Sequence, residues 1–350
     1  MGRKLGEMFK EEQSHFPIKL NTFQREFGQE SGKLLMEYFP EASEEIQGII
    51  DVIHQNHELF TSWLLCMGCC LRIREKHNVE VRGCTAFSFI HGNQIYYGRD
   101  NDLPPYLKHV SKSIYYEPTK KHRFILNTSS FVNGEEGINE HGLVVAMTFV
   151  LPVMEEIQPG LNALFLVRYI LEHCKTVQDG IHALQTFPIA SSCNLLLADK
   201  ANDMVVAECS PFEIHLRYPE ENDHGDHFIV TVNHFTSEEM SQHDASNKNI
   251  YSSKKRYDTA YNALKKMGNQ DSVHYAKEIL SGKHGFMCQY RKTIKFETIW
   301  SSVFEITNNK VYRAEGNPME TEYIEDTRLK SSLIHTNKKE ITTENKPRSR

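Results

Sequence analysis

The sequence lacks any hydrophobic run that is long enough to cross a membrane. Its most apolar window, residues 59–73, is shorter than the roughly 20 residues that a membrane-spanning helix requires. The opening residues 1–16 contain no apolar core of the signal-peptide type, and Gly6 stands where a myristoylation signal has Ser or Thr. We therefore expect a cytoplasmic protein with no membrane partner.

A strong excess of charge of either sign is also missing. The 40 Lys and Arg residues and the 46 Asp and Glu residues give a formal net charge of -6. An affinity for nucleic acid does not follow from this balance, and the glycine-rich phosphate loops of nucleotide-binding proteins are absent. A small molecule is therefore the expected partner.

Cysteine is sparse, with 8 in 350 residues, which excludes the dense disulfide framework of a small secreted domain. Three of the cysteines, Cys66, Cys69 and Cys70, resemble half of a zinc site. A structural zinc site needs four ligands, and no second pair follows at metal-ligand spacing. We expect these cysteines to be buried thiols rather than metal ligands.

The pattern of the chain changes at Cys84. Residues 1–83 are predicted to be helical, with a helical run that begins at Pro40 and has apolar residues at three- and four-residue steps. From Cys84 onward, short alternating stretches with turns at 91–93 and 139–142 are typical of strands. Helices are expected at 160–174, 176–188, 252–267 and 271–282, and further strands at 192–210, 213–219, 227–235, 297–306 and 310–316.

Strand runs that are separated by helix runs favour an α+β fold, with antiparallel sheets covered by helices, over a doubly wound parallel sheet. Residues 1–83 form a helical leading segment in this interpretation, and 84–330 form the main domain. The polar residues 331–350 are expected to be a disordered tail.

The pair Gly83-Cys84 stands at the point where the pattern changes, and it is suited to self-cleavage. A thiol that directly follows a glycine can attack the glycine carbonyl, because no side chain crowds the approach. The cut would free an α-amine on Cys84 with a pKa of about 7.7 to 8.0, and this amine can take the proton of its own thiol. A cysteine packed in the core is the alternative, and these residues alone leave both open.

Arg99 and Asp102 lie at the far end of the hairpin that returns the chain towards Cys84. A carboxylate there can accept a hydrogen bond from the new ammonium group or from the thiol, and a guanidinium can stabilise a thiolate. A surface salt bridge is the alternative interpretation.

Seven motifs in this order resemble the N-terminal-nucleophile (Ntn) hydrolases of the choloylglycine hydrolase and penicillin V acylase type: RGCTAF, GRDND, EGINEHGLVVAMTF, LLADKANDMVVAECSP, TVNHF, SSKKR and TIWSSVFE. The resemblance covers Pro40 to Pro318 and is closer to the isopenicillin N acyltransferase branch, in which a long leading segment precedes a Gly-Cys cut. It implies a four-layer αββα sandwich of two antiparallel sheets between helical layers. It also implies that 1–83 is a pro-segment or small subunit and that 84–330 is the catalytic domain.

The resemblance also implies roles for single residues. Cys84 matches the nucleophile that is freed by cleavage after Gly83, and Arg99 and Asp102 match the arginine and aspartate beside it. Arg256, in SSKKR, matches the second active-site arginine of the family.

Two further residues match the family's oxyanion hole. Asn233, in TVNHF, matches the asparagine whose side-chain amide helps to form the hole, and a turn asparagine is the alternative reading of this residue. The second donor falls near Thr148, where the bile-salt enzymes have asparagine, so a main-chain N–H would have to serve.

The implied activity is that of an autoproteolytically matured cysteine hydrolase or acyltransferase. It would act on the linear C–N amide bond of an N-acyl substrate through an acyl-thioester on Cys84, without a metal or an organic cofactor. Two alternatives stay open. One is an acyl-CoA-dependent N-acyltransferase that uses the same site with an acyl-thioester donor, and the other is an unprocessed, non-catalytic binding protein with this fold.

The leading segment is expected to stay bound after cleavage, because its apolar helical faces need a partner. Assembly into a homo-oligomer stays open. Substrate specificity is expected to lie in loops such as 103–118. Its tyrosines Tyr106, Tyr115 and Tyr116 could face an apolar acyl group, and the alternative is that they belong to the surface or the core.

Overall fold

The computed structural model describes residues 1–11, 18–71, 73–74, 78–79, 83–130, 132–245, 252–288, 290–291 and 296–330. The tail predicted at 331–350 lies outside the described residues. Within them, no helix combines the length and the apolar character that crossing a membrane demands.

Helices occupy the leading segment and two later parts of the chain. Their bounds are α1 Gly2–Glu11, α2 Thr22–Tyr38, α3 Pro40–Ile53, α4 His57–Cys66, α5 Ala163–His173, α6 Val177–Thr186, α7 Ser253–Lys265 and α8 Ser272–Leu280, with 3-10 turns η2 Pro105–Val110, η3 Met154–Glu156 and η4 Glu239–His243. The helical run predicted from Pro40 is in fact two helices. His54 ends α3 in a left-handed conformation with φ 54°, and the Asn56 side chain caps α4 by accepting a hydrogen bond from the Leu59 N–H.

The strands form two large antiparallel sheets. The first has the order β11-β10-β9-β8-β7-β6-β5, with bounds β5 Lys112–Tyr116, β6 Phe124–Thr128, β7 Glu136–Asn139, β8 Val144–Phe149, β9 Cys193–Ala198, β10 Met204–Cys209 and β11 Ile214–Arg217. The second has the order β12-β13-β3-β4-β15-β16-β17, and β14 also pairs with β15; its bounds are β3 Gly83–His91, β4 Gln94–Leu103, β12 Glu220–Glu221, β13 His227–Thr231, β14 Tyr290–Arg291, β15 Phe296–Glu305, β16 Lys310–Ala314 and β17 Ile324–Asp326. A short pair, β1 Ile73–Arg74 and β2 Asn78–Val79, precedes them.

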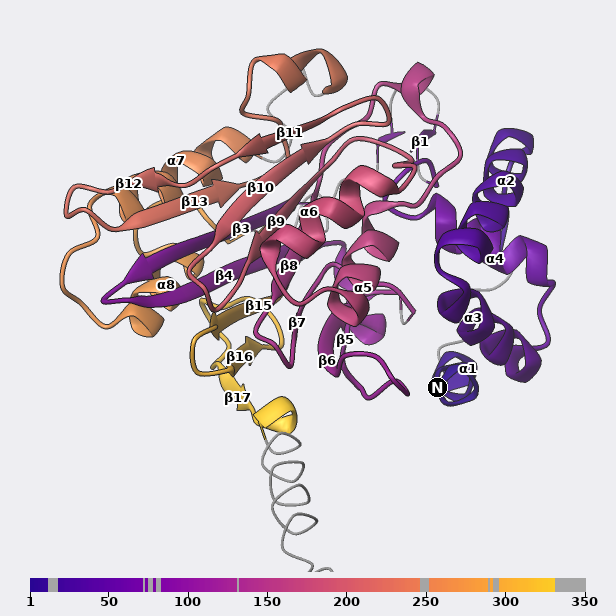
Figure 1. Cartoon of the computed structure of the whole chain (residues 1–350), viewed down its shortest axis with the longest axis horizontal. Helices are drawn as coiled ribbons and strands as arrows, with labels where there is room; N and C mark the ends of the chain where they lie inside the picture. Colours follow the sequence, from indigo (N-terminus) through magenta and orange to yellow (C-terminus); the bar gives the residue numbers. More distant parts are fainter. Residues whose placement is uncertain are drawn as a thin grey trace, which may run out of the picture.

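Helices cover the outer faces of both sheets. Helices α5 and α6 pack on strands β6 to β10 of the first sheet, and α7 and α8 pack on β13, β3, β4 and β15 of the second (Figure 1). The inner faces of the two sheets share one apolar core, in which Ala86 and Tyr97 of the second sheet meet Ile138 and Val144 of the first. The predicted α+β, four-layer αββα architecture is therefore confirmed.

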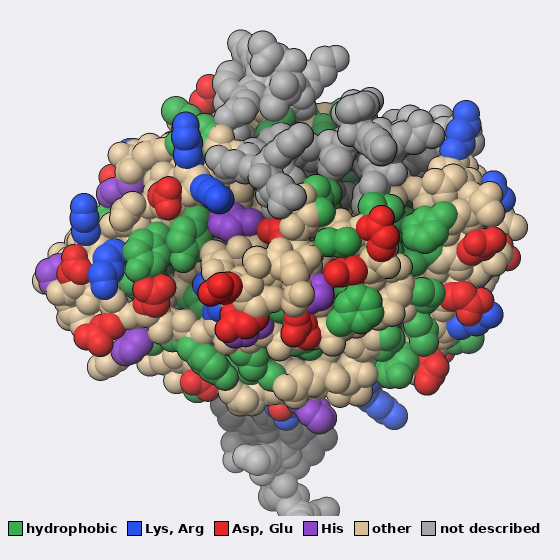
Figure 2. Space-filling model, turned by 90° about the horizontal axis from the view of Figure 1, so that it is seen from above, with side chains coloured by type: hydrophobic (Ala, Val, Ile, Leu, Met, Phe, Trp, Pro, Cys, Tyr) green, Lys and Arg blue, Asp and Glu red, His purple; other side chains and the backbone are tan. Residues whose placement is uncertain are grey.

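Charged side chains of both signs are interspersed over the face that Figure 2 shows. This distribution agrees with the small net charge of the sequence. On the described part of this face, neither sign forms an extended field.

A fully buried carboxylate connects the two sheets. Glu136, on β7, accepts a hydrogen bond from Asn127 Nδ2 of β6 at 2.9 Å, and from Tyr97 Oη of β4 at 2.6 Å. It also accepts from Trp300 Nε1 at 2.9 Å and from Ser302 Oγ at 2.7 Å, both on β15. Four donors from both sheets thus converge on a single side chain.

The leading helices pack against α5 through both apolar and polar contacts. The Arg168 guanidinium of α5 forms a buried ion pair with Glu45 of α3 at 3.0 Å. The Asn162 side chain caps α5 by accepting from the Phe165 N–H, and its Nδ2 donates to the carbonyls that end α4, those of Leu64, Leu65 and Met67. In the intact chain, therefore, the start of α5 and the end of α4 share one hydrogen-bonding side chain.

The segment 103–118 was predicted to be a loop, but it contains the 3-10 turn η2 and the edge strand β5. Tyr116 is buried, with the Arg168 guanidinium 4.0 Å from its ring centroid, whereas Tyr106 is exposed. Of the three predicted environments, Tyr116 therefore occupies the core and Tyr106 occupies the surface. The strand was missed because its five residues alternate only weakly between polar and apolar side chains.

We expect Glu136→Ala to lower the free energy of unfolding by roughly 3 kcal/mol or more, because it leaves four buried donors without their acceptor. Glu136→Gln retains one oxygen and is expected to cost less. Urea denaturation measures both, with exposed Glu37→Ala as the control that stays within about 0.5 kcal/mol of the wild type. Equal stability of the Ala and wild-type chains would contradict the bridging role.

Candidate active site

Cys84 lies near the start of β3, at a point where its strand has a neighbour on one side only. Strand β13 pairs with β3 as far as Thr231 and Ala86, so the ladder on that side stops before Cys84. Two side chains take its place. The Cys84 N–H donates to Asn233 Oδ1 at 2.7 Å, and Arg256 Nη1 donates to the Cys84 carbonyl.

The thiol of Cys84 is held from the other side, by β4. Arg99 Nη2 donates to Cys84 Sγ at 3.2 Å, and Asn101 Oδ1 lies 3.4 Å from Sγ. Arg99 Nη2 also donates to Asn101 Oδ1 at 2.8 Å, and Arg99 Nη1 donates to the Met147 carbonyl of β8. We refer to Cys84, Arg99, Asn101, Asn233 and Arg256 as the Cys84 cluster.

The cluster is buried, and its charges act directly on the thiol. Cys84 is only 2% exposed. Burial raises the pKa of the Cys84 thiol, while the adjacent Arg99 guanidinium opposes this rise. Asp102 adds to the rise in the pKa, and Arg256 opposes it. The intact chain therefore favours the neutral thiol, with a cation already in contact with the sulfur.

The orientation of the Asn233 amide follows from its neighbours. Its Oδ1 accepts from the Cys84 N–H and from Arg256 Nη2 at 2.7 Å, and its Nδ2 donates to the Phe149 carbonyl at 2.8 Å. Since a guanidinium only donates and a carbonyl only accepts, the amide cannot be reversed. The second N–H of Nδ2 has no partner among the described residues, and the predicted oxyanion role of Asn233 depends on this N–H.

Asp102 lies beside the predicted cleavage point, on the opposite face of β4 from Asn101. It is paired with Gly83 across the hairpin, and its Oδ1 accepts from Thr298 Oγ1 at 2.5 Å. A Cβ on residue 83 would lie 2.8 Å from Asp102 Oδ2 and 3.1 Å from Phe296 Cζ. Glycine is thus the residue that fits at position 83.

The side chain of Thr148 makes contacts away from the thiol. Its Oγ1 donates to the Val232 carbonyl at 2.6 Å and accepts from Asn194 Nδ2 at 3.1 Å. The main chain of Thr148 runs between the Met147 carbonyl, which binds Arg99, and the Phe149 carbonyl, which binds Asn233. A main-chain donor near Thr148 stays a prediction.

Sequence reasoning missed Asn101. Arg99 and Asp102 were both expected beside the thiol of Cys84, but residues three apart on a strand point to opposite faces, whereas residues two apart share a face. Accordingly Arg99 and Asn101 contact the thiol, and Asp102 lies on the side of Gly83. The alternation of GRDND was the signal that could have identified Asn101.

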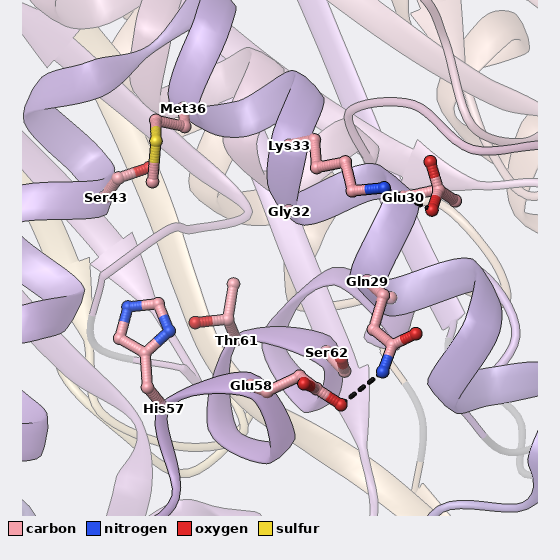
Figure 3. A pocket seen from close by; sticks show the side chains of 11 residues that line it. Gln29, Glu30, Gly32, Lys33, Met36, Ser43, His57, Glu58, Thr61 and Ser62 are labelled. Carbon is pink, nitrogen blue, oxygen red and sulfur yellow. Dashed lines mark hydrogen bonds and ion pairs between the residues drawn. The ribbon is translucent and has the colours of Figure 1, made fainter.

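A cavity of about 580 Å³ lies among the leading helices (Figure 3). Its lining comes from α2, α3 and α4, for example Lys33, Met36, Ser43 and His57, and includes no member of the Cys84 cluster. The described cavity therefore does not open on the thiol.

Among the described residues, three possible metal ligands, His122, Glu140 and His141, have donor atoms within 4.8 Å of one another. Both oxygens of Glu140 already accept hydrogen bonds from Arg123, from its main-chain N–H at 2.9 Å and from its Nε at 2.8 Å. The two imidazoles are hydrogen-bonded to each other at 2.9 Å. This arrangement is complete without an ion.

The cysteines Cys66, Cys69 and Cys70 are free and buried, as expected. Cys66 ends α4, and the other two lie in the turn that follows. They pack with Phe27 and Ile157 in a small apolar cluster.

The four layers and the Cys84 cluster define an αββα protein with a buried thiol at the start of a central strand. Residues 90–320 match the family described as acyl-coenzyme A:6-aminopenicillanic acid acyl-transferase, and the chain belongs to this family. The resemblance inferred from the motifs is thereby confirmed, and membership indicates an enzyme that acts on amides. The match includes Arg99, Asp102, Thr148, Asn233 and Arg256 but begins after Gly83-Cys84.

Two solved structures are similar to the chain. The penicillin V acylase from Agrobacterium tumefaciens is 16% identical with a TM-score of 0.44, over 70% of this chain and 87% of that one. A variant of the conjugated bile acid hydrolase from Clostridium perfringens is 10% identical with a TM-score of 0.44, over 70% of this chain and 93% of that one. No curated protein matched the sequence.

Asn233→Leu is expected to destabilise the chain by roughly 2 to 4 kcal/mol, because the Cys84 N–H and an Arg256 N–H lose their acceptor while buried. Asn233→Asp keeps an oxygen towards both donors and should cost less. Thermal unfolding is compared in a Cys84→Ala background, which retains the main-chain N–H of residue 84. Equal melting temperatures of the Leu and Asp variants would show that Asn233 does not act as the hydrogen-bond acceptor in place of the missing strand.

Asp100 gives a pH-dependent prediction. Burial, and then the neighbouring Asp102 carboxylate, raise the pKa of Asp100 well above the usual 3.8. The folded chain therefore retains this proton when the unfolded chain has lost it, so the free energy of unfolding falls as the pH rises above the unfolded pKa, by up to about 1.4 kcal/mol per pH unit.

Asp100→Asn has no carboxyl group at this position, so its free energy of unfolding should not fall with pH in this way. The difference in free energy of unfolding between the variant and the wild type should be near zero at about pH 4 and should grow in favour of the variant towards about pH 7, as measured by urea denaturation across that range. A difference that is constant with pH would show that Asp100 ionises in the folded chain as it does in the unfolded one.

Proposed function

We propose that the chain cuts itself between Gly83 and Cys84, and that the freed Cys84 is the nucleophile of a hydrolase or acyltransferase for N-acyl substrates. The observation that carries this proposal is the environment of Cys84. Its N–H, carbonyl and thiol are each bound by a different residue that the family resemblance singled out, namely Asn233, Arg256 and Arg99. A packed core cysteine has no need of three such contacts.

The cut follows from attack of Cys84 Sγ on the carbonyl carbon of Gly83. The S–C bond forms, the Gly83–Cys84 C–N bond breaks, and the thiol proton passes to the departing nitrogen, which Asn233 Oδ1 holds. Water then hydrolyses the thioester and leaves a carboxylate on Gly83 and a free thiol on Cys84. Arg256 holds the carbonyl of Cys84 in place while the Cys84 nitrogen changes from an amide to an amine.

In the mature enzyme, the α-amine of Cys84 takes the thiol proton, and Sγ attacks the acyl carbonyl of the substrate. The oxyanion is bound by Asn233 and by a main-chain N–H near Thr148. The amide C–N bond breaks, the leaving amine takes the proton, and the acyl group remains on sulfur. Arg99 stabilises the thiolate, and Asp102 orients the new α-amine. Water or a second amine then removes the acyl group.

The surroundings of Gly83 favour acyl groups with an unbranched α-carbon. In the self-cleavage step the acyl group is Gly83 itself, so its position marks the place of the substrate acyl group. Substituents on that α-carbon would meet Asp102 and Phe296. A CH₂ group next to the acyl carbonyl therefore fits, and an α-methyl group does not.

An acyl-coenzyme A donor is the second candidate, and the description of the family favours it. The thiol and the oxyanion donors would serve an acyl-thioester in the same way as an amide. In either reaction, residues 1–83 act as a small subunit that remains bound to 84–330. The buried Arg168–Glu45 ion pair and the contacts of Asn162 with α4 support this association.

The intact mass of the purified chain tests the cut. The wild type should give two fragments that meet at Gly83 and Cys84, and Cys84→Ala should give one species of 40.5 kDa. Gly83→Ala should be cut far more slowly, because its Cβ has no room beside Asp102. Gly32→Ala is the matched control, since its Cβ would meet only ordinary contacts, at 3.6 and 4.0 Å, and it should be cut like the wild type.

A wild-type chain that stays whole would overturn the proposal and would favour the non-catalytic binding protein. If the chain is cut, the release of free amine from penicillin V and from N-acyl amino acids with straight and α-methyl acyl groups tests the substrate class. Turnover of acyl-coenzyme A with an amine acceptor, without release of amine from this panel, would favour the transferase.

A further inference from the structure

Asn101 is placed at the reacting atom, although no role has been assigned to it so far. It is fully buried on β4, directly opposite Cys84 in the hairpin. Its Oδ1 lies 3.4 Å from Cys84 Sγ and accepts from Arg99 Nη2 at 2.8 Å.

The backbone brings the two side chains close together. Asn233 binds the Cys84 N–H and Arg256 binds the Cys84 carbonyl, so both of these groups point away from β4. Cys84 and Asn101 therefore form a non-hydrogen-bonded pair, the type of antiparallel pair in which side chains approach most closely. The proximity of the amide to the sulfur is thus a property of the strand register.

The nitrogen of the Asn101 amide has no acceptor. Nδ2 is buried and makes no hydrogen bond among the described residues. The amide cannot reverse to relieve this, because Oδ1 faces the guanidinium of Arg99, which only donates. A buried amide nitrogen without an acceptor costs free energy, and that cost is recovered when an oxygen arrives within reach.

We propose that Asn101 Nδ2 is a donor to the oxyanion that forms during acyl transfer at Cys84, a role that rests on the proposed function. As Sγ bonds to the acyl carbon, the π electron pair moves to the carbonyl oxygen, which then accepts from Nδ2. Collapse of this intermediate returns the pair and expels the amine, which carries the former thiol proton. Because the donor is unpaired before the reaction and paired in the transition state, it lowers the barrier rather than the KM.

Two substitutions separate this donor role from mere positioning of Arg99 and the thiol. Asn101→Leu removes both the acceptor and the donor. Asn101→Asp keeps an acceptor towards Arg99 and the thiol but has no N–H. A positioning residue would tolerate Asp, whereas an oxyanion donor would tolerate neither substitution.

The experiment compares two reactions of the same thiol in the mature enzyme. Acylation by p-nitrophenyl hexanoate passes through an oxyanion, but alkylation by iodoacetamide does not. We expect both variants to lose about 10²- to 10³-fold in kcat for acylation, on the plateau of the pH profile, with little change in KM. The alkylation rate of Asn101→Leu should not fall.

Asn127→Leu is the matched control, since it also replaces a buried asparagine between the sheets, where Asn127 bonds Glu136. It should lose stability but keep its kcat. If Asn101→Leu is cut too slowly to yield mature enzyme, the rate of its self-cleavage becomes the measure of acylation. That rate should fall relative to wild type while alkylation of Cys84 persists.

Retained acylation in Asn101→Asp, or an equal loss of acylation and alkylation in Asn101→Leu, would overturn the donor role. These outcomes leave the wild-type cut and its Cys84 dependence unaffected. Failure of the proposed function is recognised separately, because the wild type itself would then stay whole or fail to take up the hexanoyl group.

Discussion

The arrangement around Cys84 depends on a place where a β-ladder stops. Strand β13 accompanies β3 only as far as Ala86, so the N–H and carbonyl of Cys84 would be buried without partners. Asn233 and Arg256 supply an acceptor and a donor in place of the missing strand. Because the backbone of Cys84 needs hydrogen-bond partners, an amide and a cation lie beside Cys84, the residue that directly follows the proposed cut.

The electrostatics of the cluster follow from its depth. The Cys84 thiol, the Arg99 guanidinium and the Glu136 carboxylate are buried between the two sheets, where water does not screen them. Burial favours the neutral thiol, and the contact with Arg99 favours the thiolate. Burial lowers the pKa of the Arg99 guanidinium, and its neighbours Cys84, Tyr97 and Glu136 raise it by more. Glu136, with its four donors, also holds the two sheets together.

Much of the fold was predictable from local pattern. The hairpin of β3 and β4 turns at Gly92 and Asn93, both with positive φ, as the sequence HGN indicated. Between Cys193 and Ala314, strands β9, β10, β11, β13, β15 and β16 and helices α7 and α8 also lie where alternation and helical spacing placed them, whereas the short strands β12 and β14 were not predicted. Strand β5 was missed because an edge strand of five residues has a weak signal, and one helical run proved to be two because a left-handed histidine leaves little trace in sequence.

The sequence by itself determined the family, the change from helix to strand at Cys84 and most residues of the cluster, because these depend on local spacing and on motif order. Only the tertiary structure decided what each of them touches. Alternation along β4 sets Arg99 and Asn101 beside the thiol and turns Asp102 towards Gly83, and the early end of β13 leaves room for Asn233 and Arg256. These contacts join residues up to 172 positions apart, and strand register, which long-range packing sets, determines them.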